Sequence, residues 1–309
     1  MSFLHFLEGL RNPVFDAFFS LVTRLGEETF FIVMGMVFFW CINKRLGYYL
    51  LSVGLTGTVL NQFLKLTFRI PRPWVRDNTL TVVGDATEAA TGYSFPSGHT
   101  QTALGIYGGI ARWYKSKWVR IVCITVCVLV AFSRMYLGVH TPADVLVSSL
   151  LAMVLVFGFY PIIAKATDSQ KGVRILFTAM TLFAIGYMLF VNLYNFPADT
   201  DAENLAHGIK NSYTMLGCIL GIWLSFELDN RFIKFDTKAV WWVQLIKLVL
   251  GFALVMAIKS GLKQPLYAIL GEGYFADGVR YFLMTAFAGC VWPITFKYFN
   301  KLSKNWKLR

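Results

Sequence analysis

The chain has 309 residues, of which 56% are hydrophobic and 15% are charged, and its formal net charge is +12. A soluble domain usually contains about 45–50% apolar and about 25% charged residues, so this composition excludes an ordinary soluble protein. The apolar residues form runs of about 20, the length that crosses the hydrocarbon core of a bilayer. We therefore predict an all-α integral membrane protein that crosses the membrane several times. No nucleic-acid partner is expected, because the basic residues lie in loops and form no exposed basic domain.

The first segment, residues 3–24, mixes apolar and charged side chains, and Asn12-Pro13 interrupts it. Asn12 is suited to cap a helix, and Pro13 is suited to the first position of that helix. The segment is too polar to span a membrane. We therefore predict two amphipathic interfacial helices within residues 1–26.

The rest of the chain contains nine apolar segments that are candidate spans. They lie at 29–42, 46–66, 98–114, 118–135, 143–164, 174–194, 211–227, 239–258 and 279–297. The expected fold is a helical bundle of about nine transmembrane helices, preceded by the interfacial helices. We expect three parts: the interfacial helices (1–26), a core that carries the functional motifs (27–170) and a four-helix membrane extension (171–309).

The loops between the candidate spans differ in charge. Lysine and arginine predominate on one side, in residues 43–45, 112–120, 165–174 and 231–238 and in the tail after Phe296. The positive-inside rule places this side in the cytoplasm. We therefore expect a multi-pass protein of the plasma (or bacterial inner) membrane, with its N-terminus outside and its C-terminus inside.

Three polar clusters lie at the opposite, extracytoplasmic ends of these spans. The first is Lys65-x6-Arg72-Pro73, in which Lys65, Arg69 and Arg72 would share a helical face if the helix continued to Pro71. Such a group of cations is suited to bind an anion. It is also explained by the favourable placement of cations at the C-terminus of a helix.

The second cluster is Pro96-Ser97-Gly98-His99, directly before an apolar segment. The N-terminus of a helix offers free N–H groups to a phosphate, and glycine lets the backbone approach that phosphate closely. An ordinary helix cap explains the same residues. The string by itself does not decide between these interpretations.

The third cluster is Ser133-Arg134-x5-His140-x3-Asp144. Thr141 and Asp144 have the spacing of a capping box at the start of a helix. In a functional interpretation, Asp144 accepts a hydrogen bond from one ring nitrogen of His140, so that the other nitrogen can attack phosphorus. Both interpretations can hold at once.

In this order, the three clusters resemble the signature of the type 2 phosphatidic acid phosphatase superfamily, over about residues 46–165. The resemblance implies that His140 is a nucleophile that forms a phosphohistidine, that Asp144 orients it, and that His99 serves first as general acid and then as base. It also implies a set of phosphate-binding residues, namely Lys65, Arg72, Ser97, the backbone N–H of Gly98 and Arg134. The family needs no metal ion or other cofactor.

The predicted function is that of a metal-independent membrane phosphatase for a lipid phosphate or lipid diphosphate at the outer face. Three alternatives stay open: a phosphatase of a small soluble ester, a lipid phosphotransferase and a multi-span anion transporter. The nine-span layout is similar to the sphingosine-phosphate phosphatase and glucose-6-phosphatase branches. A transporter would need matched broken helices, and the sequence shows no such repeat. Apart from the substrate and membrane lipids no partner is predicted, and the sequence does not reveal the oligomeric state.

Two features remain outside the clusters. Lys247 lies within the predicted span 239–258, where a lysine either lines a substrate cleft or pairs with neighbouring helices. The five cysteines all lie in apolar segments. We therefore predict neither disulfides nor a metal site for them.

Overall fold

The structure is a computed structural model that describes residues 1–84, 86–88, 90–164 and 170–307. These residues form helices and connecting loops, with no β-strand among them. The predicted all-α class is thereby confirmed. Of the basic loop expected at 165–174, residues 165–169 lie outside the described part of the chain.

The chain divides into two compact units, which are described separately. Unit 1 comprises Met1–Met34, Tyr49–Lys165 and Tyr194–Gly208. Unit 2 comprises Gly35–Tyr48, Ala166–Leu193 and Ile209–Arg309. All three polar clusters of the sequence belong to unit 1.

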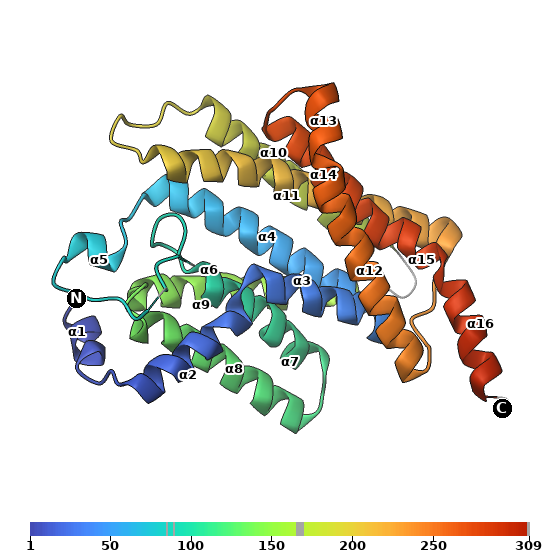
Figure 1. Ribbon diagram of the computed structural model, residues 1–309, viewed down its shortest axis with the longest axis horizontal. Helices are drawn as coiled ribbons and strands as arrows, with labels where there is room; N and C mark the ends of the chain where they lie inside the picture. The colour runs from blue at the N-terminus through green and yellow to red at the C-terminus, as the bar shows by residue number, and fades with distance from the viewer. Residues whose placement is uncertain (85, 89, 165–169, 308–309) are drawn as a thin grey trace. The chain divides into compact units, whose positions relative to one another are not determined.

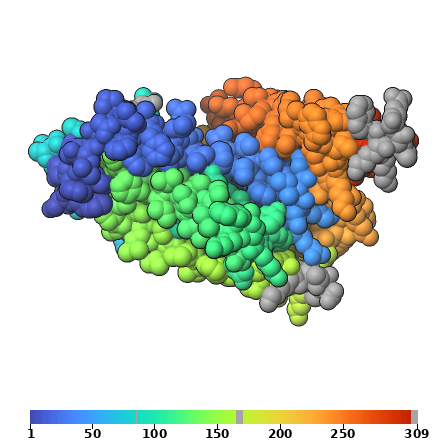
Figure 2. All heavy atoms as spheres, turned by 90° about the horizontal axis from the view of Figure 1, so that it is seen from below, coloured from blue at the N-terminus to red at the C-terminus, as the bar shows by residue number. Residues whose placement is uncertain are grey.

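Unit 1 is built mainly from helices of the first half of the chain. They are α1 (Ser2–Glu8), α2 (Pro13–Thr23), η1 (Arg24–Gly26), the first part of α3 (Glu28–Val37), α4 (Lys44–Phe68) from Tyr49 onward, α5 (Pro73–Arg76), α6 (Gly98–Ala103), the π-helical η3 (Leu104–Gly108), α7 (Gly109–Trp113), α8 (Lys117–Tyr136) and α9 (Pro142–Ala164). Helix α6 packs against both α8 and α9, and α2 lies along α8 (Figure 1). Accordingly, the dark-blue surface of the N-terminal helices lies beside the green surface of α8 in Figure 2.

Unit 2 contains the remaining helices. They are the π-helical η2 (Phe38–Ile42), the start of α4, α10 (Lys171–Leu193), α11 (Ala202–Leu228) from Ile209 onward, the π-helical η4 (Asp229–Ile233), α12 (Trp241–Gly261), α13 (Lys263–Leu270), α14 (Tyr274–Ala286), the π-helical η5 (Phe287–Val291), α15 (Trp292–Ile294) and α16 (Phe296–Lys307). Helices α11 and α14 approach closely because both carry glycine at the contact. A Cβ on Gly217 would lie only 2.2 Å from the carbonyl oxygen of Gly278. Small residues permit such backbone contact between membrane helices.

Five helical stretches among the described residues are long and apolar enough to cross a membrane, namely Lys117–Tyr136, Pro142–Ala164, Lys171–Leu193, Trp241–Leu270 and Tyr274–Ser303. They correspond to five of the predicted spans. The stretches Pro13–Gly26 and Glu28–Ile42 pass the same test as a pair, although the chain bends by 53° between them. The predicted spans 46–66, 98–114 and 211–227 are helical, but they are not among these candidate spans, because they are interrupted or are more polar than the five stretches. The nine-span count is therefore not confirmed.

The two helices predicted before residue 26 are present as α1 and α2. Asn12 caps α2, since its Oδ1 accepts hydrogen bonds from the backbone N–H groups of Val14 and Phe15 at 3.1 and 3.0 Å. Pro13 is the first residue of that helix. Several apolar side chains of α2, among them Val14 and Phe18, are exposed, as expected of a helix in contact with lipid. Their position at the membrane surface stays a prediction.

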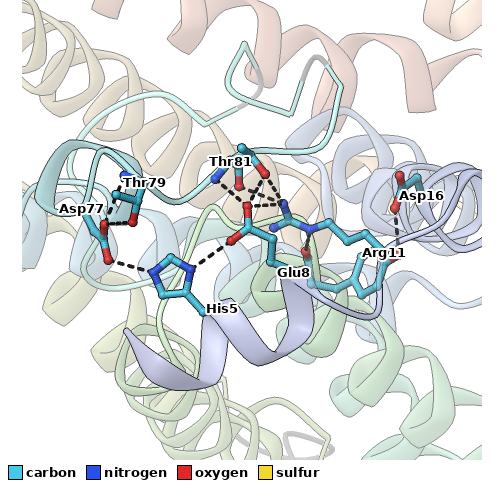
Figure 3. Close-up of polar contacts among 8 residues, drawn as sticks. His5, Glu8, Arg11, Asp16, Asp77, Thr79 and Thr81 are labelled. Carbon is cyan, nitrogen blue, oxygen red and sulfur yellow. Dashed lines mark hydrogen bonds and ion pairs between the residues drawn. The ribbon is translucent and has the colours of Figure 1, made fainter.

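A polar clasp joins α1 to the loop that follows α5 (Figure 3). It consists of His5, Glu8, Arg11, Asp77, Thr79 and Thr81. The ring of His5 lies between two carboxylates, with Nδ1 2.9 Å from Glu8 Oε2 and Nε2 2.9 Å from Asp77 Oδ2. Glu8 accepts hydrogen bonds from the backbone N–H of Thr81 at 2.9 Å and from its hydroxyl, and Arg11 donates to the Thr81 carbonyl at 2.9 Å. The clasp thereby fixes the loop at residues 77–81.

Within unit 2, Lys247 is fully buried in α12. Its Nζ donates a hydrogen bond to the carbonyl oxygen of Thr237 at 3.3 Å and lies 4.2 Å from the centre of the Phe296 ring. Both partners belong to the same unit. Of the two roles open from the sequence, the structure favours pairing with neighbouring segments.

We expect the polar clasp to weaken as the pH rises above neutrality. The hydrogen bonds with Asp77 and Glu8 raise the pKa of His5 above its usual 6.5. Hydrogen bonds from Thr79 and Thr81 lower the pKa of Asp77 and of Glu8 to about 2, so both carboxylates stay charged. The contribution of the imidazolium is complete below the unfolded pKa of 6.5 and is lost as the pH passes the raised folded pKa. Hydrogen exchange of residues 77–83, corrected for its intrinsic pH dependence, will show the change.

The control for this prediction is His5→Gln, which keeps a polar side chain but cannot take up a proton. In this variant, protection of residues 77–83 should be independent of pH between about pH 5.5 and about pH 8.5. If the protection of residues 77–83 depended on pH equally in the wild type and in the variant, the pH effect could not be assigned to His5.

We also expect Lys247→Met to leave the Tm nearly unchanged or to raise it. Methionine fills a similar volume, and removal of a buried charge that lacks a carboxylate partner is often neutral or stabilising. Lys247→Ala should instead lower the free energy of unfolding by about 2–4 kcal/mol, because it leaves a cavity. Thermal unfolding of the detergent-purified variants tests both. If Lys247→Met lost as much thermal stability as Lys247→Ala, the charge itself would be required.

Candidate active site

The three sequence clusters meet at one end of unit 1. The contributing segments are the last turn of α4 (Lys65), the residue before α5 (Arg72), the start of α6 (Ser97, Gly98 and His99), the last turn of α8 (Arg134) and the turn into α9 (His140 and Asp144). The cations among them are buried, with exposed fractions of 5% for Lys65, 6% for Arg72 and 0% for Arg134. Buried cations need anionic or carbonyl partners nearby.

Arg72 does not lie on α4, although the spacing of the first cluster suggested a shared helical face. Helix α4 ends at Phe68, and Arg69 has a left-handed backbone with φ of 48°. Pro71 and Pro73 explain this ending, because a residue before proline is pushed out of the helical region. Arg72 therefore reaches the site from an extended segment.

Arg72 contacts the imidazole of His140 directly. Its Nη1 lies 2.9 Å from His140 Nε2 and also donates to the carbonyl oxygen of Val139 at 3.1 Å. An arginine can only donate, so Nε2 is the acceptor, and the proton of a neutral ring resides on Nδ1. The other donors of Arg72, Nε and Nη2, bind the carbonyl oxygens of Gly92 and Thr91 at 2.9 and 2.7 Å.

The carboxylate of Asp144 faces the other ring nitrogen. Its Oδ2 lies 3.4 Å from Nδ1 of His140. The same oxygen accepts hydrogen bonds from the Ser94 hydroxyl at 2.6 Å and from the backbone N–H of Thr141 at 2.8 Å. Thr141 Oγ1 in turn accepts from the backbone N–H of Asp144 at 3.3 Å. The capping box expected from the sequence is thus present, and its carboxylate also lies beside the histidine ring, although Nδ1 makes no hydrogen bond among the described residues.

The charge state of His140 follows from its surroundings. Burial lowers the pKa of His140 well below its usual 6.5, and the positive charges of Arg72, Arg134 and Lys65 act in the same direction. The imidazole is therefore neutral near pH 7. A neutral ring with a proton on Nδ1 carries its lone pair on Nε2, the atom that accepts from Arg72 in this structure and that is suited to nucleophilic attack once this hydrogen bond moves.

A tight turn between α8 and α9 places His140 in the site. Gly138 has φ of +82°, in the left-handed region that glycine adopts readily. The turn brings the backbone N–H groups of Val139 and His140 to the carbonyl oxygen of Arg134 at 3.1 and 3.2 Å. A Cβ on Gly138 would lie 2.8 Å from the carbonyl oxygen of Thr81. The loop that the polar clasp fixes therefore packs on the turn that presents His140.

Arg134 brings buried donors to the site. Its Nη1 donates to Thr23 Oγ1 at 2.6 Å, whereas Nε and Nη2 are buried without a hydrogen-bond partner among the described residues. Buried N–H groups are nearly always paired in native proteins, so these two are suited to bind the oxygens of an anion. Lys65 donates one hydrogen bond, to the carbonyl oxygen of Thr91 at 3.1 Å, and an ammonium group has two further N–H groups.

His99 lies in the first turn of α6, which Ser97 caps through its side chain. The Nε2 atom of His99 is buried and has no partner within the described structure. The ring interacts electrostatically with His140 and Arg134. Gly26 permits a close approach here, because a Cβ on it would lie 2.8 Å from the carbonyl oxygen of His99. The structure thus brings the second cluster to the other two.

A cavity of about 340 Å³ extends to Arg72. Its lining includes Arg69, Arg72 and Tyr93, together with Asp199 and Asp201 from the segment before α11. Arginines are suited to bind a phosphate group, and carboxylates are suited to accept hydrogen bonds from donors on the same ligand. The cavity is therefore a candidate entrance for a phosphorylated molecule.

The site combines cationic hydrogen-bond donors with imidazole bases. The donors suit an anion. In the part of the chain that the structure describes, no group of three or more His, Cys, Asp or Glu side chains is arranged to hold a metal ion. The five cysteines are unpaired with one another.

Three positioning residues were not identified from the sequence: Thr23, Thr91 and Ser94. Ser94 lies two residues before the second cluster. Serine is common in loops, so its presence there did not indicate a role. Thr91 contributes only its carbonyl group, which every residue has. Thr23 is 111 residues away from Arg134 along the chain, so no local pattern connects the two.

Two family models match the chain. The model of the PAP2 superfamily matches residues 45–168, and these residues contain all three clusters. The model described as "PAP2 superfamily phosphatase, transmembrane extension" matches residues 213–305. No solved structure matches the chain.

Several curated proteins are similar to the chain. Phosphatidylglycerophosphatase B of Bacillus subtilis is 30% identical over 161 residues, which cover 48% of this chain and 75% of that protein. Undecaprenyl-diphosphatase BcrC of the same species is 28% identical over 151 residues, which cover 48% of this chain and 75% of that protein. Sphingosine-1-phosphate phosphatase 1 of Mus musculus is 25% identical over 268 residues, which cover 80% of this chain but 59% of the mouse protein.

We expect Ser94→Ala to lower the kcat of phosphate release about 10- to 100-fold, because a hydrogen bond to a charged group contributes about 1.5–3 kcal/mol. Without the hydroxyl, Asp144 is held less firmly against His140. The acid limb of the pH–rate profile should also shift, because the carboxylate then interacts differently with the ring. Steady-state kinetics between about pH 5 and about pH 8 measure both effects.

The matched control is Ser148→Ala. Ser148 is also buried, but its hydroxyl donates to the backbone carbonyl of Asp144 at 2.8 Å and not to the carboxylate. Its removal should leave kcat and the pH profile unchanged, whereas Ser94→Thr should restore activity in part. Equal losses in both alanine variants would indicate a merely structural role for Ser94.

Proposed function

Because the chain belongs to the PAP2 superfamily, we propose that it hydrolyses a lipid phosphate through a phosphohistidine formed on His140. At the coarser level, the chain is a membrane lipid phosphatase of this superfamily and hence a hydrolase. The proposal concerns the mechanism, the roles of the individual residues, the substrate and the side of the membrane.

The contact between Arg72 and His140 is the observation that carries the mechanism. It requires Nε2 of His140 to be an acceptor, and the guanidinium of Arg72, 2.9 Å from that atom, supports a role of this arginine in phosphate binding. On the other side of the ring, Asp144 faces Nδ1. His140 therefore lies between the proposed anion-binding group, Arg72, and the proposed orienting carboxylate, Asp144, before any substrate is bound.

In the first step, Nε2 of His140 attacks the phosphorus atom. A P–N bond forms while the bond from phosphorus to the lipid oxygen breaks, and His99 gives its proton to that leaving oxygen. Arg72 moves its hydrogen bond from Nε2 to a phosphate oxygen, and Arg134 donates its two unpaired N–H groups. Preorganised donors of this kind stabilise the charge that develops in the transition state. Asp144 stabilises the positive charge on the phosphorylated ring.

In the second step, water attacks the phosphohistidine. His99, which lost its proton in the first step, now removes a proton from the water. The new P–O bond forms as the P–N bond breaks, which releases inorganic phosphate and restores the neutral ring of His140. The protonated His99 is then ready for the next ester.

The substrate we propose is a lipid phosphate whose headgroup region also carries hydrogen-bond donors. The matched relatives are named as an undecaprenyl-diphosphatase, a phosphatidylglycerophosphatase and a sphingosine-1-phosphate phosphatase, so each name refers to a phosphorylated lipid. The entrance cavity adds Asp199 and Asp201 to its two arginines. Carboxylates at this position favour a hydroxyl or ammonium group near the phosphate, as in sphingosine 1-phosphate.

We further propose that the catalytic end of unit 1 faces the extracytoplasmic side and that the chain crosses the membrane nine times. The distribution of lysine and arginine supports this orientation, since the basic residues Arg112, Lys117 and Arg120 lie in or beside the loop between α7 and α8, at the end of α8 opposite to Arg134. A lipid phosphate in the outer leaflet could then reach the helix ends while its acyl chains stay in the bilayer.

The test is phosphate release by the full-length, detergent-purified chain with EDTA present. Phosphatidate, sphingosine 1-phosphate, a polyprenyl diphosphate and glucose 6-phosphate serve as substrates. Wild type should release phosphate fastest from sphingosine 1-phosphate, and His140→Ala should lower the rate on the order of 10³-fold or more, because the nucleophile is absent. His207→Ala, a histidine variant outside the site, is the matched control and should keep full activity.

His99→Ala provides a second measurement. With ³²P-labelled substrate, this variant should accumulate an acid-labile, base-stable phosphoprotein, because the base that activates water is missing. Loss of this adduct in the double variant with His140→Ala is expected. Activity that persists in His140→Ala, or an adduct with the stability of a phosphoserine, would show that the mechanism is wrong.

A further inference from the structure

A second cavity, of about 630 Å³, lies among η3, α7, α8 and α9 within unit 1. Its volume falls in the range of about 300–1,000 Å³ that is typical of small-molecule sites. One face of α8 and one face of α9 form most of its walls, through Ile124, Val128, Met153 and Phe157. These four side chains are 42–60% exposed, so the cavity is open to the surroundings of the protein. Both helices are long and apolar enough to cross a membrane, so we expect the open side of the cavity to face lipid.

The cavity contains two guanidinium groups, from Arg112 and Arg120, and no carboxylate. Arg120 Nε binds the carbonyl oxygens of Ala111 and Tyr114 at 3.3 and 3.1 Å. Arg120 therefore has a structural role at the end of α7, but it still adds a positive charge to the cavity.

No carbonyl partner of this kind is found for Arg112 among the described residues. Its Cζ lies over the ring of Tyr160, 3.8 Å from the ring centre, and its Nε is buried without a hydrogen-bond partner in that part of the chain. Stacking on an aromatic ring leaves the N–H groups in the guanidinium plane free to donate. A buried donor without an acceptor, in a cavity that also contains a second guanidinium and no carboxylate, indicates a ligand that brings an anionic oxygen.

This cavity is distinct from the candidate active site. Arg120 and Arg134 lie 14 residues apart on α8, which corresponds to about 21 Å along the helix axis. The cavity runs along α8 from Arg120 to Ala131, or about 16 Å, so it is long enough for much of an acyl chain. None of its lining residues belongs to the three clusters.

We propose that this cavity binds an anionic phospholipid of the bilayer, with its phosphate at Arg112 and Arg120 and one acyl chain between α8 and α9. The guanidinium fork matches two phosphate oxygens, and the apolar walls match the chain. The proposal does not rest on the reaction assigned to the other end of α8. It assigns this ligand to a site that is separate from the substrate phosphate site.

The test measures lipid binding to the full-length chain in mixed micelles. Phosphatidylglycerol and phosphatidylcholine with identical acyl chains are titrated, and the retained lipid is quantified by native mass spectrometry. Wild type should bind phosphatidylglycerol at least fivefold more tightly than phosphatidylcholine and should gain several degrees in Tm from it. Arg112→Gln should abolish this preference, whereas Arg112→Lys should retain part of it because the charge remains.

Two further variants separate the site from general effects of charge and folding. Lys117→Gln removes an exposed cation at the start of α8 that does not line the cavity, and it should leave the preference unchanged. Val128→Trp keeps both arginines but fills the space between the helices, and it should reduce the binding of both lipids at least fivefold. Equal affinity of the wild type for both lipids, or an unchanged preference in Arg112→Gln or an unchanged affinity in Val128→Trp, would overturn the proposal.

Discussion

The burial of three cations beside two imidazoles is the constraint on which the rest of unit 1 depends. Lys65, Arg72 and Arg134 are each at most 6% exposed, and charges of one sign held together away from water are costly. Backbone carbonyl groups of residues 91–92 and the carboxylate of Asp144 offset part of this cost. Two donors of Arg134, Nε and Nη2, have no acceptor within the described structure. The proposed phosphate ligand would supply the missing negative charge, and the electrostatic cost of the free site would favour its binding.

The N-terminal helices support that site from a distance along the chain. Thr23 at the end of α2 holds one nitrogen of Arg134, and the polar clasp on α1 fixes the loop that packs against Gly138. Because Gly138 forms the turn that presents His140, the position of this histidine depends on contacts of residues that lie more than 100 positions earlier in the chain. Residues 1–26 therefore have a structural part in the site, whatever their position in the membrane.

Helix α8 shows how the surroundings of an arginine decide what it does. At its C-terminal end, Arg134 is fully buried, interacts electrostatically with His99, and has two donors without a partner among the described residues. Near its N-terminal end, Arg120 binds backbone carbonyls and lies with Arg112 at an apolar cavity. Both places suit a phosphate group. Only the first also contains the two histidines to which we assign the roles of nucleophile and acid, so the proposed reaction is confined to that end.

The sequence alone was enough for the fold class, the three clusters and the capping box of Asp144, because composition and local spacing determine these features. The condition for a helical face shared by Lys65 and Arg72 is not met, since α4 ends at Phe68, before the two prolines. The nine-span count is unconfirmed because polar motifs lower the hydropathy of the segments that carry them. The sequence did not predict contacts between segments that are distant along the chain. Sequence determined which chemical groups are present and at which helix ends. Only the tertiary structure decided that Arg72 meets Nε2 of His140 and that Ser94 holds Asp144, because packing of separate helices sets those distances.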